Sequence, residues 1–461
     1  MNSSMWGSSS RSFERLYLSN IHLLLALVVL TLWARQSWGA GYPIPEPPPV
    51  IEQTTALQVP ATLSLWDALS LSLRHNPQLN ASKWAIRGFD ARVTRAGLLP
   101  NPRLRIALED FGGSGDHRGY NVAETTLMLS QLIELGGKRL KRYRLAGTER
   151  DLAVWDYEAE RLQVAMTTIQ AFIGVLADQQ RVELSHQILA LAEKLHETVS
   201  ARVKAGEVSR LERYKSRVEL ARARLQATRA EQLLVTSRQR LAATWGAFEP
   251  RFEQVTGNLL EIQSPPDLPV LVTRLESNPD VARWATEMAR RQRLLDVAKA
   301  ATIPDLTIRA GIRQYAENGD VAAVAVFQLP LFIFDNQKTR VDEATAGINQ
   351  AQYLRRANLV EARRQLVSAY QQLQQTRIAV EILHDEVLPS AKAAFDAVRE
   401  AYRVGKVGVL DLIDAQRTLF SARRQQVDIL AAWHLWRAAL ERLVGGTLTP
   451  QQTSSDNEAQ T

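Results

Sequence analysis

Two aspartates, Asp411 and Asp414, are the residues whose type and spacing best fit a chemical role. They follow a stretch with glycines at 405 and 408, which permit a turn between two helices. Residues three apart lie on one face of a helix, so both carboxylates leave the helix on the same side of its first turn. A carboxylate in this position is stabilised by the helix dipole, and a cluster of carboxylates attracts cations. The spacing alone leaves both interpretations open.

A second pattern, Glu-x-x-His, occurs at Glu183 and His186 and again at Glu381 and His384. On a helix this spacing lets an acid and an imidazole bind one metal ion, as in di-iron bundles. Such a site also needs carboxylates from two facing helices, and long polar helices produce these pairs by chance. We therefore predict no metal site and no cofactor.

The composition excludes several classes of chemistry. The 461 residues include no cysteine, which excludes thiolate-bound zinc, iron–sulfur clusters, a cysteine nucleophile and disulfides. No Ser-His-Asp order, zinc signature or paired-acid cleft is visible, so we predict that the chain is not an enzyme. The net charge of +7 comes from 56 basic and 49 acidic residues that are interleaved along the chain. This charge is too diffuse for a nucleic-acid-binding face, and we expect no nucleic-acid partner.

The N-terminus has the three parts of a secretory signal peptide. Two arginines precede an apolar stretch from Ile21 to Leu32, and small residues follow it. The stretch is shorter than the about 20 residues that a permanent membrane-spanning helix needs. We predict a signal peptide over residues 1–39, a proline-rich linker over 40–62 and export of the mature chain.

The rest of the chain consists of one unit of about 200 residues that occurs twice. Four features recur in the same order, 202, 204, 197 and 199 residues later: Asn76-Pro77 as Asn278-Pro279, Leu99-Pro100-Asn101 as Ile303-Pro304-Asp305, Gln131-Leu132 as Gln328-Leu329, and Gly206 as Gly405. We place the repeats at residues 63–246 and 273–445, with an equatorial segment over 247–272 between them. A disordered tail is predicted over 446–461.

Each repeat is predicted to contain one very long helix, at about 138–203 and about 337–403. Apolar residues recur three and four positions apart, as at Leu162, Met166 and Ile169. At about 1.5 Å per residue each helix is about 100 Å long. The helix that follows each long helix is shorter than the long helix. The remaining helices make up this difference in length if they stack end to end with it.

Four short segments are predicted to be strands, at about 103–110, 125–132, 305–313 and 321–329. In the first, Leu104, Ile106 and Leu108 alternate with polar residues, and Ile308 belongs to the same pattern in the third. Apolar-out, polar-in alternation is typical of membrane β-strands. Four strands cannot close a barrel, which needs about eight, whereas three copies supply twelve. We therefore predict a mainly α fold with a small β part, which as a homotrimer forms a membrane β-barrel and an α-helical barrel.

This layout, from about Ser64 to Gly445, resembles the TolC-type outer membrane efflux family. Three runs resemble its heavy-metal, CzcC-like branch, associated with cobalt-zinc-cadmium resistance: GLLPNP at 97–102, EDFGG at 109–113 and LSQLIELGGKR at 129–139. Leu132 stands where relatives usually carry proline. The resemblance implies a homotrimer with a 12-stranded β-barrel in outer membrane lipid and a helical barrel in the periplasm.

The resemblance also implies a function. It predicts the channel component of a tripartite efflux system, bound to a periplasmic adaptor (membrane fusion) protein and an inner membrane pump of the resistance-nodulation-division class. The cargo would be divalent heavy-metal cations such as cobalt, zinc, cadmium or nickel. A duct for organic toxicants or for type I protein secretion, and a soluble coiled-coil scaffold, remain the alternatives.

The family further assigns roles at the turn between the helices. Asp411 and Asp414 match its periplasmic aspartate gate, which in a trimer forms a ring of carboxylates that concentrates cations. Tyr402 matches a gate-holding tyrosine, and Glu212 matches the acidic partner of that tyrosine in the first repeat. Val407 stands where the family has a gate arginine, so we expect the closed state to be held more weakly.

Overall fold

The structure is a computed structural model that describes residues 59–335 and 337–448. The predicted signal peptide, most of the predicted linker and most of the predicted tail lie outside these residues. Two of those boundaries are wrong at their inner ends. Thr62, predicted as linker, pairs with Gln254 in a short parallel ladder. Leu448, predicted as disordered tail, is buried, and its N–H donates to the carboxylate of Glu441 (3.1 Å).

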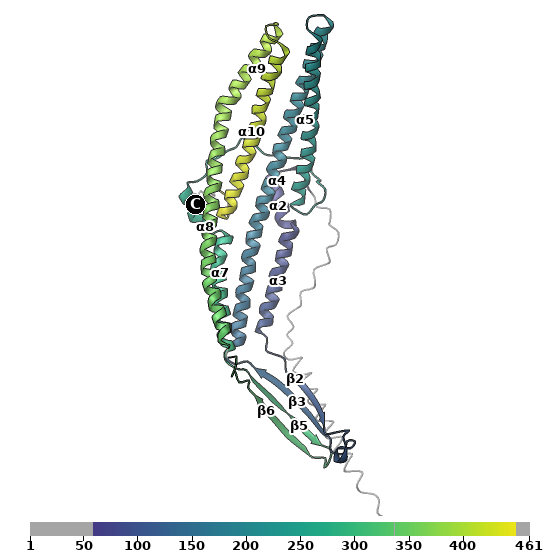
Figure 1. Cartoon of the computed structure of the whole chain (residues 1–461), viewed down its shortest axis with the longest axis vertical. Coiled ribbons are helices and arrows are strands. Elements are labelled where there is room, and N and C mark those ends of the chain that lie inside the picture. The colour runs from purple at the N-terminus through teal and green to yellow at the C-terminus, as the bar shows by residue number, and fades with distance from the viewer. Residues whose placement is uncertain (1–58, 336, 449–461) are drawn as a thin grey trace, which may run out of the picture. The chain divides into compact units, whose positions relative to one another are not determined.

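The same order of elements occurs in both halves of the chain (Figure 1). In the first half these are β1 (Thr62–Leu63), α2 (Leu65–His75), α3 (Pro77–Gly97), β2 (Arg103–Glu109), a 3₁₀ turn (Gly115–His117), β3 (Glu124–Ile133), α4 (Lys138–Lys204) and α5 (Arg210–Ala243). In the second half they are β4 (Gln254–Val255), α6 (Leu268–Leu275), α7 (Pro279–Ala301), β5 (Leu306–Tyr315), β6 (Val321–Gln328), α8 (Lys338–Ile382), a π-helical turn (Leu383–Val387), α9 (Leu388–Arg403) and α10 (Val409–Val444).

The four longer strands form one antiparallel sheet in the order β2-β3-β5-β6. Each repeat contributes a hairpin, and the two hairpins join where β3 pairs with β5, for example Leu127 with Ile312. Gly311 permits this join, because a Cβ there would overlap the carbonyl oxygen of Leu127. The apolar side chains of β2, including Leu104 and Ile106, are exposed in the single chain.

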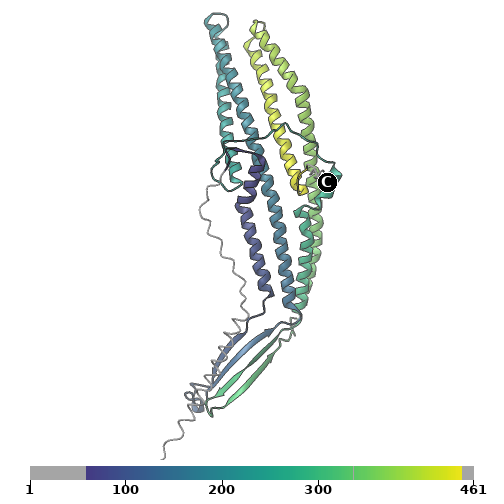
Figure 2. The ribbon, with the colours of Figure 1, turned by 180° about the vertical axis from the view of Figure 1, so that it is seen from behind.

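Beyond the sheet the helices form two hairpins, α4–α5 and α9–α10, which lie side by side (Figures 1 and 2). α10 packs against both α9 and α4, whereas α5 packs mainly against α4. Consequently α5 and α9 lie at opposite edges of the four-helix layer in both views. Within residues 59–335 and 337–448, no helix combines the length and the apolar character that crossing a membrane requires.

The repeated Asn-Pro motif joins helices end to end. This is the stacking that was predicted from the difference in length between the long helices and the helices that follow them. Asn278 begins α7, where its side-chain oxygen accepts from the N–H of Asp280 (2.8 Å). Its side-chain NH₂ donates to the last carbonyl oxygens of α10, at Arg442 (2.7 Å) and Leu443 (3.0 Å). One amide therefore caps two helices, because it supplies an acceptor to free N–H groups and donors to free carbonyls.

Asn76 performs the same double role in the first repeat. Its side-chain oxygen accepts from Leu79 N–H (3.0 Å), and its NH₂ donates to the carbonyl of Thr244 at the end of α5 (2.8 Å). The close stacking needs glycine at 246, where φ is +80° and a Cβ would lie 2.9 Å from the ring of Pro77. The chain before the first long strand therefore forms two helices, α2 and α3, divided at this asparagine.

The residues of the predicted long helix over about 337–403 are helical from Lys338 to Arg403, but the helix is not regular in its middle. A π-helical turn at Leu383–Val387 separates α8 from α9, and the N–H of Leu388 donates to the carbonyl of Leu383, five residues back. Pro389 follows directly and has no N–H for an α-helical bond, so the chain widens by one residue at this point. The equivalent helix of the first repeat, α4, contains no proline and runs unbroken from Lys138 to Lys204.

Candidate functional site

The two helical hairpins turn at their tips in the same way. After α9, the N–H of Lys406 donates to Ala401 (2.9 Å), and Gly405 has a φ of +77°. After α4, the N–H of Glu207 donates to Arg202 (2.9 Å), and Gly206 has a φ of +79°. A left-handed glycine that closes these bonds is the usual end of a helix before a tight turn. The glycines thus fix the direction in which α5 and α10 return.

The predicted gate carboxylates lie at the start of α10, and both are exposed. Asp411 accepts a hydrogen bond from the backbone N–H of Gly408 (2.9 Å), so it helps to cap the helix. The side chain of Asp414 is 73% exposed, with a guanidinium nitrogen of Arg417 at 3.8 Å. The structure therefore gives Asp411 a capping role and leaves a second, solvated carboxylate on the same face. A cap and a cation-attracting group are compatible here, since a helix N-terminus stabilises negative charge and a cluster of carboxylates attracts cations.

Tyr402 is only 8% exposed and lies in an apolar cluster with Leu195 and Val199 of α4 and Ile413 of α10. The guanidinium of Arg202 lies 5.4 Å from the centre of its ring, a cation–π distance. A hydrogen bond from Arg202 to Glu207 (3.1 Å) raises the pKa of the arginine. The tyrosine thus attaches α9 to α4 by packing.

Glu212 is the third residue of α5, the position that Asp411 occupies in α10. One of its carboxylate oxygens is buried without a hydrogen-bond partner, and so is the hydroxyl of Tyr402. The single chain therefore contains no hydrogen bond between the two predicted gate-holding partners. Buried polar atoms without partners are uncommon, so both atoms are candidates for contacts outside the chain.

The Glu-x-x-His pairs form no metal centre. Instead of Glu183, His186 has Glu231 of α5 as its partner, at 3.1 Å. Glu183 and His384 both line a pocket of about 740 Å³ between α4, the π-helical turn, α9 and α10. Across the described ranges, no group of three or more His, Asp or Glu side chains is placed to hold a metal ion.

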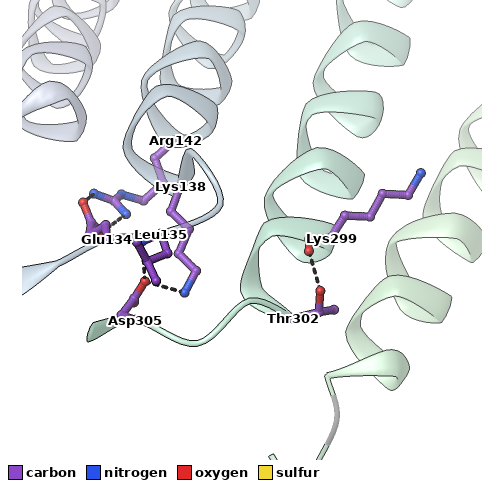
Figure 3. A network of polar contacts seen from close by, with 7 residues as sticks. All are labelled: Glu134, Leu135, Lys138, Arg142, Lys299, Thr302 and Asp305. Atoms are coloured by element: carbon purple, nitrogen blue, oxygen red, sulfur yellow. Dashed lines mark hydrogen bonds and ion pairs between the residues drawn. The ribbon is translucent and has the colours of Figure 1, made fainter. Parts of the chain in front are cut away.

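One polar network was not predicted from the sequence, although all of its residues except Arg142 belong to motifs already described (Figure 3). Asp305, at the start of β5, accepts from the N–H of Leu135 (3.0 Å) and from the ammonium of Lys138 (2.7 Å). Glu134 and Arg142 form a two-bond pair beside it, and this hydrogen bonding raises the pKa of Arg142. The network attaches the first turn of α4 in one repeat to the first strand of the other.

This attachment depends on the paired glycines of the LSQLIELGGKR run. Gly136 and Gly137 have φ of +67° and +68°, which turn the chain sharply from β3 into α4. A Cβ at Gly136 would also lie 2.8 Å from the side chain of Ile303. The glycine pair, the lysine that follows it and the Ile-Pro-Asp motif of the second repeat therefore form one junction between sheet and helices.

Comparison with known proteins agrees with this architecture. The family model described as "Outer membrane efflux protein" matches residues 68–247 and 270–446. The chain is 33% identical to the cobalt-zinc-cadmium resistance protein CzcC of Cupriavidus metallidurans over 83% of this chain and 90% of that protein. It is 27% identical to the nickel-cobalt-cadmium resistance protein NccC of Alcaligenes xylosoxydans over 61% of this chain and 63% of that protein.

The fold is shared with solved outer membrane channels. The CmeC outer membrane channel of Campylobacter jejuni matches with a TM-score of 0.71 at 18% identity, over 85% of this chain and 88% of CmeC. CusC matches with a TM-score of 0.70 at 15% identity, over 83% of this chain and 92% of CusC. The match to the family model and to CzcC confirms the resemblance drawn from the repeated motifs. The chain therefore belongs to the outer membrane efflux protein family and has its TolC-like fold.

Proposed function

We propose that this chain is the outer membrane channel of a tripartite efflux system that exports divalent heavy-metal cations of the cobalt, zinc, cadmium or nickel type. The observation that carries the proposal is the 33% identity to CzcC over 90% of that protein, whose name assigns it to cobalt-zinc-cadmium resistance. The similarity to the nickel-cobalt-cadmium resistance protein NccC also supports a divalent metal cargo.

The sheet supports a homotrimer in the outer membrane. In the part of the chain that the structure describes, β2 and β6 each pair on one side only, which leaves two open edges. Open edges pair readily with further strands. Joining β6 of one copy to β2 of the next in three copies closes a 12-stranded barrel. The exposed apolar residues of β2 and β6, among them Ile106 and Phe327, then face outer membrane lipid.

The tip supports a cation path. Three copies bring Asp411 and Asp414 together as a ring of carboxylates at the periplasmic end, which raises the local concentration of cations and repels anions. In the proposal Tyr402 and Glu212 hold the closed state, and their unpaired buried oxygens find partners when the copies and the adaptor assemble. The energy for export enters at the inner membrane pump, so the channel itself transports passively, without catalysis or a cofactor.

Sensitivity of the host to metals tests the cargo. Deletion of the gene in its own diderm host is expected to increase sensitivity to at least one of cobalt, zinc, cadmium and nickel, and expression of the chain is expected to restore resistance. Unchanged sensitivity to all four metals, together with increased sensitivity to organic toxicants, would support the alternative duct instead.

Fractionation tests the assembly. The signal-bearing protein is expected in the outer membrane fraction, and light scattering of the detergent-extracted protein is expected to give the mass of three mature chains. A soluble monomer or dimer would contradict the channel and support a coiled-coil scaffold.

A further inference from the structure

One face of the four-stranded sheet carries no charged side chain. Residues paired across neighbouring strands point to the same face, and successive residues of a strand alternate between the two faces. Leu104 of β2 pairs with Leu129, Leu129 pairs with Ala310, and Ala310 pairs with Ala325 of β6. We refer to the face that contains this row as the uncharged face. Every second residue from this row, along each of the four strands, is uncharged.

The opposite face contains all the charged residues of the four strands. The register brings them together, because Arg103 and Arg309 are both partners of Ser130, and Arg105 lies on the next row of the same face. Across one row, Arg103 and Arg309 are two strand spacings, or about 10 Å, apart. The charged residues of this face are Arg103, Arg105, Glu109, Glu124, Arg309 and Arg313.

The two signs of charge are separated along the strands. At the end away from the helices, Arg313 forms ion pairs with Glu124 (2.5 Å) and Glu109 (3.6 Å). Arg103 is the first residue of β2, next to the junction with the helices (Figure 1), and Arg105 follows two positions later.

The arginines at the helix end have no acidic partner. Arg309, near the start of β5, donates only to the neutral side-chain oxygen of Gln328 (2.5 Å). Arg103 and Arg105 are exposed. Within residues 59–335 and 337–448, none of these three arginines forms an ion pair. The helix end of the charged face is therefore positive and uncompensated.

The proposed trimer determines which face lines the bore. A charged side chain on the lipid face of a membrane β-barrel is destabilising, most strongly at the middle of the bilayer. The uncharged face avoids this cost, and Leu104, Ile106 and Phe327 on it are 65%, 69% and 70% exposed in the single chain. The charged face therefore lines the interior of the barrel.

We propose that Arg103, Arg105 and Arg309 form a belt of positive charge around the bore of the membrane barrel. Three arginines in each of three copies give a belt of nine guanidinium groups. The belt favours small anions over divalent cations and hinders the return of exported metal cations from outside. The proposal rests on the proposed trimeric channel and specifies the charge selectivity of its membrane-spanning part.

The dimensions of the barrel allow such a belt to act on the whole bore. Barrels of about 8 strands are filled by side chains, and barrels of about 16 strands leave an aqueous channel. Side-chain charges on the wall of a 12-stranded barrel therefore lie within about 10 Å of the axis, which is about the Debye length in 0.1 M salt. Rings of arginine or lysine select for anions at such distances.

The belt has the opposite sign to the carboxylates proposed at the tip. The conduit thus attracts cations where they enter from the periplasm and repels them where they could return from outside. A fixed charge slows cations in both directions, but in the proposed system only the outward movement is driven by a pump. The net effect is a smaller inward leak.

Cysteine accessibility tests the belt, because the native chain has no cysteine that could react. Full-length Arg105→Cys in outer membrane vesicles is treated with a negatively and a positively charged methanethiosulfonate, and each rate is divided by the rate of the same reagent with free 2-mercaptoethanol. The negative reagent is expected to be favoured about tenfold, because Arg103 and Arg309 remain near the thiol. Equal normalised rates, or a preference for the positive reagent, would overturn the proposal.

Ile106→Cys is the matched control, because Ile106 is the next residue of β2 and lies on the uncharged face. It is expected to react with neither charged reagent, since lipid covers that face. Reaction at Ile106→Cys with none at Arg105→Cys would mean that the two faces are exchanged, and the belt would be ruled out.

Ion selectivity in planar bilayers gives an independent test. The combined variant Arg103→Gln, Arg105→Gln and Arg309→Gln is expected to raise the ratio of potassium to chloride permeability, measured from the reversal potential in a gradient around 0.1 M potassium chloride, by about fivefold. Each single glutamine variant is expected to shift the ratio less and in the same direction, which keeps the test available if the combined variant assembles poorly. An unchanged ratio in these variants would contradict the belt.

Lysine at the same three positions separates charge from structure. Arg103→Lys, Arg105→Lys and Arg309→Lys together keep the positive charge and are expected to keep the wild-type permeability ratio. A shift as large as that of the glutamine variant would mean that the arginines act through the structure of the barrel, and the proposal would be wrong.

Failure of the channel itself gives a different result. A soluble monomer, or a wild-type protein that does not conduct in bilayers, would overturn both the proposed function and the belt. A conducting outer membrane trimer that shows none of the expected charge effects would overturn the belt alone and leave the channel standing.

Discussion

Asn278→Ala is expected to loosen the joint between α7 and α10 more than any other single asparagine substitution within residues 59–335 and 337–448. The side chain is 2% exposed and makes three hydrogen bonds that cap two helices at once. Loss of an N-cap costs about 1 kcal/mol, and each lost buried hydrogen bond costs about 1 kcal/mol more. The two donated bonds and the cap together give about 3 kcal/mol, equivalent to roughly a 100-fold change in the local opening equilibrium.

Hydrogen exchange measured by mass spectrometry on the detergent-extracted protein provides the assay, because protection of helical amides reports the free energy of local opening. Peptides that cover the start of α7 and the end of α10 are expected to exchange roughly 100-fold faster in Asn278→Ala. In Asn76→Ala the joint of α3 and α5 loses the cap and only one donated bond, so about 2 kcal/mol, or roughly 30-fold, is expected there. Asn349→Ala, at an exposed position inside α8, is the control and is expected to change little.

Asn278→Asp separates the two halves of the argument. Aspartate caps a helix N-terminus as well as asparagine does, but it has no NH₂ and would place a negative charge against the carbonyl oxygens of Arg442 and Leu443. Exchange in Asn278→Asp is therefore expected to be at least as fast as in Asn278→Ala. Wild-type protection in the aspartate variant would refute the double-cap interpretation and reduce Asn278 to an ordinary N-cap.

Three further predictions concern other parts of the molecule. Burial lowers the pKa of His434, whose ring donates to the carbonyl of Leu259 (3.0 Å). The unfolded state therefore binds more protons than the folded state, and the free energy of unfolding falls as the pH drops below about 6.5. Thermal melts between pH 7.5 and 5 should show this loss of stability, and His434→Gln should reduce it. Asp411→Asn with Asp414→Asn, which keeps a capping oxygen on α10, should weaken block of single-channel current by multivalent cations; unchanged block would place the pair away from the pore. Ile308→Asp should impair trimer assembly in the outer membrane by placing a charge against lipid; normal trimer yield would show that the strand faces the other way.

Much of the fold could be predicted because the local signals repeat. Two of the four features that recur about 200 residues apart mark the same structural event in both repeats: the Asn-Pro motifs divide stacked helices, and Gly206 and Gly405 end the long helices with a positive φ. The match to CzcC and to the family model confirms the resemblance that these motifs carried. Signals of this kind depend on residues close together in the sequence, which is why they could be recognised without a structure.

The parts that were missed depend on residues far apart. Pro389 was visible in the sequence, but whether a proline kinks, ends or widens a helix depends on the packing around it, and here the chain widens into a π-helical turn. The bond from Lys138 to Asp305 joins residues 167 positions apart, so neither motif alone predicts it. The predicted pairing of Tyr402 with Glu212 came from the family and stays a prediction, since each has a buried oxygen without a partner in the single chain.

The two repeats differ in helix geometry at one equivalent level. In the first repeat a guanidinium nitrogen of Arg423 on α10 lies 3.5 Å from the neutral Gln187, and α4 is an unbroken helix. Asp385 and Glu386, 198 and 199 residues after Gln187, are acidic and lie in the π-helical turn. The duplication therefore predicts that a long helix is present in both repeats, but not its local geometry, because that geometry depends on residues such as Pro389 that only one repeat contains.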